Sequence, residues 1–173
     1  MRNATFNMDR ITQSRFYFWT WSSPVGDLLL IADARGLRGL NFQNGPHPVE
    51  PDPAWKERRG PFKKVIQQLE GYFAGKLRTF HVELSLQGTD FQLSVWRAIR
   101  DIPYGATASY GSIAHKIGNP KASRAVGAAN GQNPVSIIVP CHRVIGKNGH
   151  LVGYGGGLSI KGALLDLERR GEC

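Results

Sequence analysis

Residues 109–129, SYGSIAHKIGNPKASRAVGAA, predict two short helices separated by a turn. Ser109 can cap the first helix and Gly118 can end it, while the second is expected over residues 119–129, with a proline at its first helical position. Two short helices joined in this way are typical of a helix-turn-helix. The second helix consists mostly of small residues, so it could approach DNA very closely. An ordinary helical hairpin that packs its alanine and glycine faces is the alternative.

The residues on both sides of this pair predict a mainly helical second half of the chain. Thr89 and Gln92 match a capping box, so a helix should begin there and stop at Pro103. After the pair, the apolar run 135–139 is expected to be extended and to lead into Cys141. The last predicted helix is amphipathic, with Ile160, Leu164 and Leu167 facing inward and with Glu168, Arg169 and Arg170 in its final turn.

The first half of the chain predicts a small sheet with one helix. Three short segments rich in apolar or aromatic residues favour an antiparallel meander. An apolar stripe with a 3.6-residue period predicts a helix that covers one sheet face, and a further alternating segment predicts one more strand. The strands are expected at Phe16–Trp21, Gly26–Ala32, Leu37–Phe42 and Thr79–Leu86, a proline-rich loop at Gly45–Pro53, and the helix from Pro61 to about Gly75.

Together these patterns predict an α+β fold with two domains. The change from strands to helices places the boundary near residues 86–90, so we expect one domain over residues 1–88 and a second over residues 89–173. A chain of 173 residues with 41% hydrophobic and 20% charged residues can bury a real core, which excludes wholesale disorder.

Charge and cysteine content narrow the possible functions. The chain has 22 basic and 13 acidic residues, and the excess of +9 is spread over both halves, which favours a polyanionic partner such as nucleic acid. It has no apolar run of membrane-spanning length and no apolar segment of a secretion signal near its first residue. Its two cysteines, Cys141 and Cys173, exclude a disulfide framework and a cysteine-rich zinc site, so we expect a reducing, cytoplasmic location.

Cys141 is the strongest candidate for chemistry. A thiol reacts as the thiolate, and positive charge on the neighbouring His142 and Arg143 would favour that form. Glu168, from the last helix, is a candidate to orient the imidazole of His142. A small buried structural cysteine is the plainer alternative.

The segment Pro140–Val144, PCHRV, resembles the 6-O-methylguanine-DNA methyltransferase family. The resemblance is strong over about residues 89–170 and loose before them. It implies a ribonuclease H-like first domain and a winged-helix-like second domain. The pieces that support it, in order, are Pro103-Tyr104-Gly105, Ser109-Tyr110, Ala125-Val126-Gly127-Ala128-Ala129, Asn133-Pro134 and Tyr154-Gly155-Gly156-Gly157-Leu158.

The activity that this resemblance implies is DNA repair by direct reversal of damage. The alkyl group of 6-O-alkylguanine in double-stranded DNA would move to Cys141 once and irreversibly, after a helix-turn-helix in the minor groove has flipped the base. Alkylated thymine is a second substrate that the residues leave open. The resemblance implies no cofactor and no metal, no membrane partner, a monomer, and a cytoplasmic protein that lies with the nucleoid in a bacterium.

The resemblance also implies the catalytic residues. Cys141 would accept the alkyl group, and His142 would take the thiol proton through a water. Glu168 would fix the tautomer of that imidazole, and Asn133 would tie the helix-turn-helix to the cysteine loop. Tyr110 would displace a phosphate and donate a hydrogen bond to the base. The plainer alternatives are a surface histidine, a solvated helix-end acid, an Asn-Pro turn and a hydrophobic anchor.

A base pocket and a DNA-contacting helix follow from the same resemblance. Tyr154 would form a wall of the pocket, the main chain of Val144 would read the exocyclic amine, Gly155 could offer only its backbone N–H to the guanine oxygen, and Lys161 would lie at the rim. Arg124 would fill the space of the flipped base, with a phosphate-binding arginine as the alternative. The expected DNA-contacting residues are Lys121, Ala122, Ser123, Arg124, Ala125 and Gly127.

Two other classes of protein are compatible with the same patterns. The first is a binding module, either a regulator or a lesion sensor that flips bases without chemistry, although such sensors lack the cysteine present here as Cys141. The second is a thiol hydrolase that uses Cys141 and His142 and forms an acyl intermediate, which water clears.

Overall fold

The structure of this chain is a computed structural model that describes residues 16–171. Cys173 and the first fifteen residues, where the sequence predicts no secretion signal, lie outside the described residues. Within residues 16–171, no helix combines the length and the apolar character that crossing a bilayer requires.

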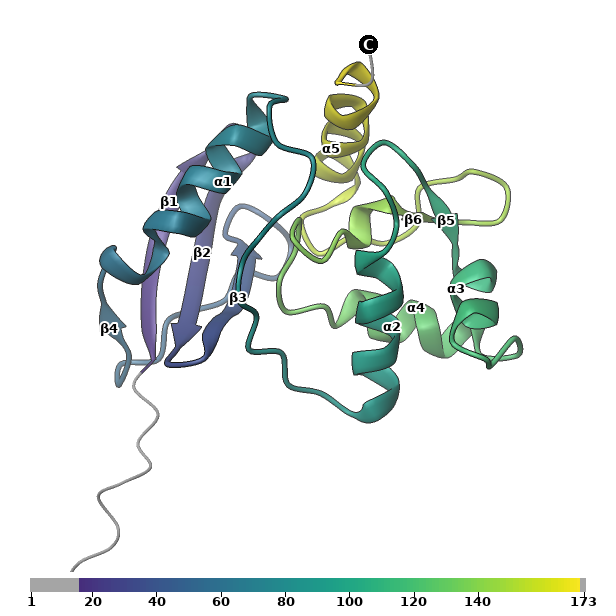
Figure 1. Ribbon diagram of the computed structural model, residues 1–173, viewed down its shortest axis with the longest axis horizontal. Coiled ribbons are helices and arrows are strands. Elements are labelled where there is room, and N and C mark those ends of the chain that lie inside the picture. The colour runs from purple at the N-terminus through teal and green to yellow at the C-terminus, as the bar shows by residue number, and fades with distance from the viewer. Residues whose placement is uncertain (1–15, 172–173) are drawn as a thin grey trace, which may run out of the picture.

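The first half of the chain forms a small sheet that one helix covers (Figure 1). The strands β1 (Tyr17–Ser23), β2 (Gly26–Asp33) and β3 (Gly36–Phe42) pair antiparallel, as the meander predicts. A two-residue strand that the sequence does not predict, β4 (Lys56–Glu57), pairs parallel with β1 inside the proline-rich connection. The helix α1 (Lys63–Phe73) follows a short 3-10 turn and buries the apolar stripe against the sheet.

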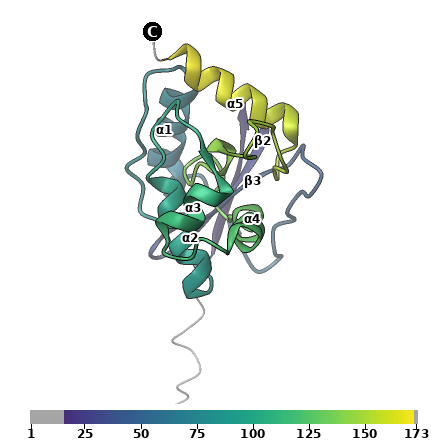
Figure 2. The ribbon, with the colours of Figure 1, turned by 90° about the vertical axis from the view of Figure 1, so that its right-hand side faces the viewer.

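The second half is mainly helical, and its last helix runs above both halves (Figures 1 and 2). The helices α2, α3 and α4 pack on one another, and α3 and α4 form the predicted helix-turn-helix pair. The elements of this half are α2 (Asp90–Arg100), β5 (Ala108–Ser109), α3 (Tyr110–Lys116), α4 (Ser123–Gly131), a 3-10 helix (Cys141–Arg143), β6 (Val144–Ile145) and α5 (Leu158–Arg170).

The predicted helix caps are confirmed. The Thr89 hydroxyl accepts from the Gln92 N–H at 3.2 Å, and the Gln92 side chain accepts from the Thr89 N–H at 2.8 Å, so both orphan donors at the start of α2 are satisfied. The Ser109 hydroxyl accepts from the N–H of Ser112 at 3.0 Å and caps α3.

The predicted start of the second helix of this pair at residues 119–120 is wrong. A turn comes first, in which the Ala122 N–H donates to the Asn119 carbonyl at 3.0 Å. Ala122 has φ −89° and ψ 18°, outside the helical region, so α4 begins only at Ser123. The proline at position 120 therefore lies in the turn and not in the first helical turn.

The predicted strand over residues 79–86 is wrong because the free edge of β3 is shared between two segments. Leu37 pairs with Leu84 at a single bridge position, and Leu40 pairs with Val135 three residues further along the same strand. At the second bridge the Leu40 N–H donates to the Pro134 carbonyl at 2.9 Å. The sheet of the first half therefore holds the segment that leads to Cys141.

The apolar run 135–139 is also not extended as predicted. Its backbone folds into tight turns, in which the N–H of Val139 donates to the carbonyl of Val135 at 2.9 Å. Ile137 adopts the left-handed region with φ 70°, a conformation that β-branched residues rarely adopt. Because the whole run is buried, packing on all sides offsets this local strain.

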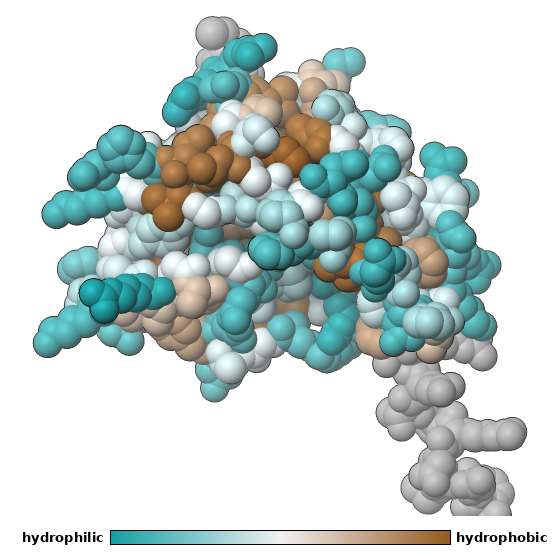
Figure 3. Space-filling model, turned by 180° about the vertical axis from the view of Figure 1, so that it is seen from behind, coloured by the Kyte–Doolittle hydropathy of each residue, from teal (hydrophilic) through white to brown (hydrophobic). Residues whose placement is uncertain are grey.

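Some hydrophobic side chains reach the surface of the molecule. Figure 3 shows the larger hydrophobic areas in the upper part of the face seen from behind, with smaller ones among the hydrophilic residues below. Among the described residues the exposed large apolar side chains are Leu151, Val152 and Leu158, which belong to the connection between β6 and α5 and to the start of α5.

We expect Thr89→Ala to destabilise the protein by about 1 kcal/mol, the typical value of a lost helix N-cap. The change removes the acceptor for Gln92 and leaves the start of α2 with an unsatisfied N–H. Urea unfolding followed by circular dichroism measures the effect. Thr79→Ala, at an exposed position outside helices and strands, is the matched control and should have almost no effect; equal losses for both variants would contradict a specific cap.

Candidate active site

Cys141 lies at the start of a 3-10 helix, directly after the tight turns of the apolar run, and its side chain is buried. Asn133, just after α4, holds this segment through three contacts. Its Nδ2 donates to the Val139 carbonyl at 2.8 Å and lies 3.0 Å from Cys141 Sγ, and its Oδ1 accepts from the Val135 N–H at 3.0 Å. The end of the helix-turn-helix and the cysteine are thereby fixed to one another.

The thiol of Cys141 is protonated at rest. Burial raises its pKa, and the hydrogen bond from Asn133 and the charge of Lys161 offset only part of that effect. The expectation that the charge of Arg143 favours the thiolate is wrong, because that guanidinium is directed to Glu168 and to the carbonyl of Ile102. A reaction at this sulfur therefore needs a base that removes the proton.

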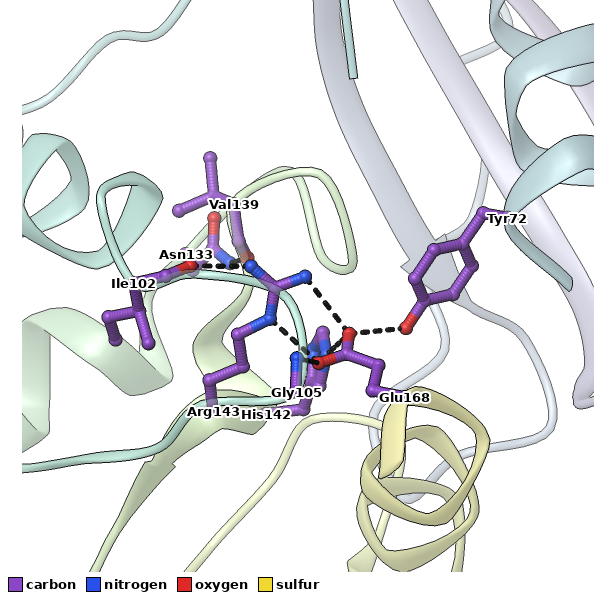
Figure 4. A network of polar contacts seen from close by, with 8 residues as sticks. All are labelled: Tyr72, Ile102, Gly105, Asn133, Val139, His142, Arg143 and Glu168. Carbon is purple, nitrogen blue, oxygen red and sulfur yellow. Dashed lines mark hydrogen bonds and ion pairs between the residues drawn. The ribbon is translucent and has the colours of Figure 1, made fainter. Parts of the chain in front are cut away.

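Glu168 is the centre of a buried polar network (Figure 4). Its Oε1 accepts from His142 Nε2 at 2.7 Å, from the hydroxyl of Tyr72 at 2.7 Å and from Arg143 Nη2 at 3.0 Å. Its Oε2 accepts from Arg143 Nε at 2.9 Å and from the N–H of Gly105 at 3.1 Å. The alternative of a solvated helix-end acid is wrong, since the carboxylate is completely buried.

The network sets the charges of its members. Burial alone would raise the pKa of Glu168, but the hydrogen bonds from His142 and Arg143 outweigh it and lower that pKa to about 2. Burial lowers the pKa of His142 more than the carboxylate raises it, so the imidazole is neutral. Because Nε2 must carry the proton that Glu168 accepts, Nδ1 holds the free lone pair. This Nδ1 is buried and has no hydrogen-bond partner among the described residues.

A cavity of about 700 Å³ opens between the helix-turn-helix and the connection before α5. Cys141 is part of its lining, together with residues from α3, from α4 and from both loops that flank the cysteine. The lining residues are His47, Tyr110, Ser123, Arg124, Gly127, Asn130, Gly131, Asn133, Ser136, Cys141, Val152, Gly153, Tyr154 and Gly155.

The structure brings most of the predicted site residues to this cavity. Tyr110, Ser123, Arg124, Gly127, Asn133, Cys141, Tyr154 and Gly155 line it. His142 and Glu168 lie behind the cysteine, buried in the network described above. Lys121 and Ala122 precede α4 and Ala125 lies in its first turn, all three outside the lining. Lys121 and Ala125 are exposed, and Ala122 is partly buried.

The predicted place of Lys161 at the pocket rim is wrong. Its side chain is completely buried, and Nζ donates to the carbonyl of Val144 at 2.7 Å and to that of Val152 at 2.8 Å. Lys161, on α5, therefore holds the start and the middle of the connection that forms one wall of the cavity. The carbonyl of Val144 is engaged by this ammonium, which leaves one lone pair for any further contact.

Sequence reasoning missed three contributors to the site. Tyr72 lies 96 residues before Glu168, and a buried tyrosine at a core position of α1 was the available signal, because its hydroxyl needs a partner. Arg143 binds Glu168 instead of acting on the thiol. His47, from the loop after β3, lines the cavity, and no pattern in the sequence indicates that the loop reaches it.

The comparisons with known proteins agree on one family. The sequence model of the 6-O-methylguanine DNA methyltransferase DNA binding domain matches residues 90–170, and that of the ribonuclease-like domain of the same methyltransferase matches residues 16–86. A methylated-DNA–protein-cysteine methyltransferase of Methanosarcina acetivorans is 54% identical over 157 residues, which cover 91% of this chain and 99% of that protein. The Mycobacterium tuberculosis protein of the same name is 51% identical over 154 residues, or 88% of this chain and 92% of that one.

Solved structures show the same likeness. The crystal structure of Mycobacterium tuberculosis OGT in complex with DNA superposes with a TM-score of 0.84 and 50% sequence identity. The alignment covers 90% of this chain and 94% of that chain. The crystal structure of Mycobacterium tuberculosis O6-methylguanine methyltransferase gives a TM-score of 0.83 at 51% identity, again over 90% of this chain and 93% of that one.

We expect Glu168→Gln to lower the free energy of unfolding at pH 7 by about 3–5 kcal/mol, because it leaves the buried Arg143 without its counter-ion. The folded-state pKa of about 2 lies below the ordinary value of 4.5, so this carboxylate stabilises the fold above pH 4.5 and the contribution disappears as the pH falls toward 2. Urea unfolding at pH 7 and pH 3 should therefore show a smaller difference at the lower pH. Asp166→Asn, an exposed acid on the same helix, is the control; a loss independent of pH would contradict the linkage.

Proposed function

The chain belongs to the 6-O-methylguanine-DNA methyltransferase family, and we propose that it repairs DNA by moving the alkyl group of 6-O-alkylguanine onto Cys141. The observation that carries this proposal is a buried cysteine at the wall of a cavity that α4 borders, with a neutral histidine beside it that an ionised glutamate orients. All of these groups come from one chain, so a monomer suffices.

The first step is binding of double-stranded DNA and extrusion of the damaged base. The net charge of +9 attracts the phosphate backbone, and the exposed side of α4 carries small residues that allow close approach in the minor groove. A base inside the duplex cannot reach Cys141, so it must leave the stack, at a cost of a few kcal/mol. Arg124, exposed at the edge of the cavity, fills the gap that the base leaves and offsets part of this cost.

The second step is the transfer itself. The proton of Cys141 passes through a water to Nδ1 of His142, and Glu168 stabilises the imidazolium that forms, as in a Ser-His-Asp relay. The thiolate attacks the alkyl carbon in line, so a carbon–sulfur bond forms while the carbon–oxygen bond breaks and its electrons remain on the guanine oxygen. The hydroxyl of Tyr110 and the backbone N–H of Gly155, both at the cavity, stabilise the leaving base.

The product explains why the protein acts only once. An S-alkylcysteine is a thioether and has no acyl carbon that water could attack, in contrast to the thioester of a thiol hydrolase. Nothing in the proposed site removes the alkyl group, so each molecule repairs one base. A sensor that only flips bases would leave Cys141 unchanged, and a hydrolase would turn over repeatedly.

We expect one repaired base per molecule and a mass gain of one methylene on the protein after reaction with a duplex oligonucleotide carrying 6-O-methylguanine. Intact mass spectrometry and a titration with excess substrate measure both quantities. Cys141→Ala should abolish the mass gain and bind the duplex almost as well as the wild type, because the side chain of Cys141 is buried. If the number of bases repaired with excess substrate levels off well above one per molecule, the result would contradict the single-use mechanism and favour the hydrolase.

We expect Arg124→Ala to slow repair of a lesion in duplex DNA by tenfold or more, corresponding to about 1.4 kcal/mol of lost stabilisation, while its reaction with free 6-O-benzylguanine changes little. The free base needs no extrusion, so only the duplex substrate depends on this arginine. Single-turnover rates on both substrates measure the difference. Lys121→Ala, also exposed but outside the cavity, is the control and should weaken binding more than it slows transfer. Equal losses on both substrates would mean that Arg124 supports the pocket instead.

A further inference from the structure

Tyr72 joins the first half of the chain to the proposed catalytic relay. It lies on α1, its side chain is completely buried, and its hydroxyl donates to Glu168 Oε1 at 2.7 Å (Figure 4). We propose that Tyr72 is a positioning residue for alkyl transfer, which holds Glu168 and limits how much of its negative charge acts on His142. The proposal rests on the proposed roles of Cys141 and His142.

Tyr72 and His142 donate to the same oxygen of Glu168. Oε1 of Glu168 accepts from Tyr72, from His142 Nε2 and from Arg143 Nη2, whereas Oε2 accepts from Arg143 Nε and from the N–H of Gly105. Each donor to a carboxylate spreads its charge and lowers its ability to stabilise another cation. The hydroxyl of Tyr72 therefore weakens the hold of Glu168 on an imidazolium at His142.

Core packing fixes the position of this hydroxyl. The ring of Tyr72 lies 5.3 Å from that of Phe73, 5.4 Å from that of Phe80 and 6.0 Å from that of Tyr104, with the first and the last arranged edge to face. Burial and the neighbouring charge of Glu168 raise the pKa of Tyr72, so it remains a donor throughout the physiological pH range. The first half of the chain thereby places a hydroxyl that stays protonated beside Glu168, to which it donates a hydrogen bond.

The charges around His142 determine the direction of the expected effect. Glu168 raises the pKa of this imidazole, while Arg143 and Lys161 lower it in addition to burial. The ring of Tyr154 packs edge to face at 6.4 Å, and Cys141 precedes His142 in the chain. Tyr72 acts on His142 only through Glu168, so removal of its hydroxyl leaves more charge on Oε1 and should raise the pKa of His142.

The decisive experiment is the pH dependence of transfer by Tyr72→Phe, which removes the hydroxyl and keeps the ring. Single-turnover rates on a duplex oligonucleotide carrying 6-O-methylguanine are measured from pH 5 to pH 9. The acidic limb of the pH–rate profile, where the transfer rate falls as His142 becomes protonated, should move to higher pH by about half a unit or more. Tyr17→Phe, the same change on β1, should leave the limb in place. A rate that falls by one factor at every pH, with the limb unmoved or moved to lower pH, would overturn the proposal.

Two further measurements separate this proposal from the proposed function. A ring-fluorinated tyrosine at position 72, whose hydroxyl is a stronger donor, should move the limb in the opposite direction and tests the proposal even if Tyr72→Phe does not fold. The His142 titration, followed by NMR in a Cys141→Ala background with and without Tyr72→Phe, needs no transfer. An unchanged titration overturns the role of Tyr72, whereas a wild-type protein that gains no alkyl group overturns the proposed function.

Discussion

The site depends on one buried carboxylate that is fully satisfied by donors from distant parts of the chain. Glu168, near the end of α5, binds His142 and Arg143 from the 3-10 helix, the amide of Gly105 from the loop after α2 and the hydroxyl of Tyr72 from α1. An isolated buried charge would be prohibitively unfavourable, so these elements must assemble together. The buried site therefore exists only where all of these elements have come together.

The second constraint acts on the backbone and comes from the edge of β3. Leu40 bonds with Pro134 and Ser136, and Asn133 then holds the turn that ends at the cysteine. The sheet thus positions the reactive sulfur through main-chain hydrogen bonds, while α1 positions the relay through Tyr72. Although no residue of the sheet takes part in the proposed chemistry, the first half of the chain determines the geometry of the second.

Local signals in the sequence predicted the elements that local interactions decide. The capping box at Thr89, the cap at Ser109 and the apolar or aromatic runs of the first three strands are predicted correctly because each depends on neighbours within a few residues. The errors lie where distant contacts decide. The segment over residues 79–86 resembles a strand, yet it makes one bridge with β3, and Val135 makes the other bridge three residues further along β3.

For the candidate site too, sequence motifs identify residues, whereas contacts between distant segments could not be predicted. The PCHRV segment and its collinear pieces indicate which residues matter, and most of them line the cavity. The sequence could not show that Lys161 lies beneath the cavity wall, or that α1 supplies a fifth contact to Glu168, because tertiary packing alone brings these groups together. The division of the chain between residues 88 and 89 stays a prediction.

The electrostatics of the resting site explain how a reactive cysteine can remain inert until a substrate is present. Burial keeps the thiol of Cys141 protonated and His142 neutral, so neither bears a charge before reaction. Of the charged groups nearby, Glu168 and Arg143 compensate each other, and the ammonium of Lys161 is held by the carbonyls of Val144 and Val152. In the proposed mechanism, transfer of the proton creates a thiolate and an imidazolium together, and Glu168 is already in place to stabilise the imidazolium without reorganisation. In the proposed mechanism the thiolate therefore forms only by proton transfer to His142, and an alkylated base in the cavity consumes it.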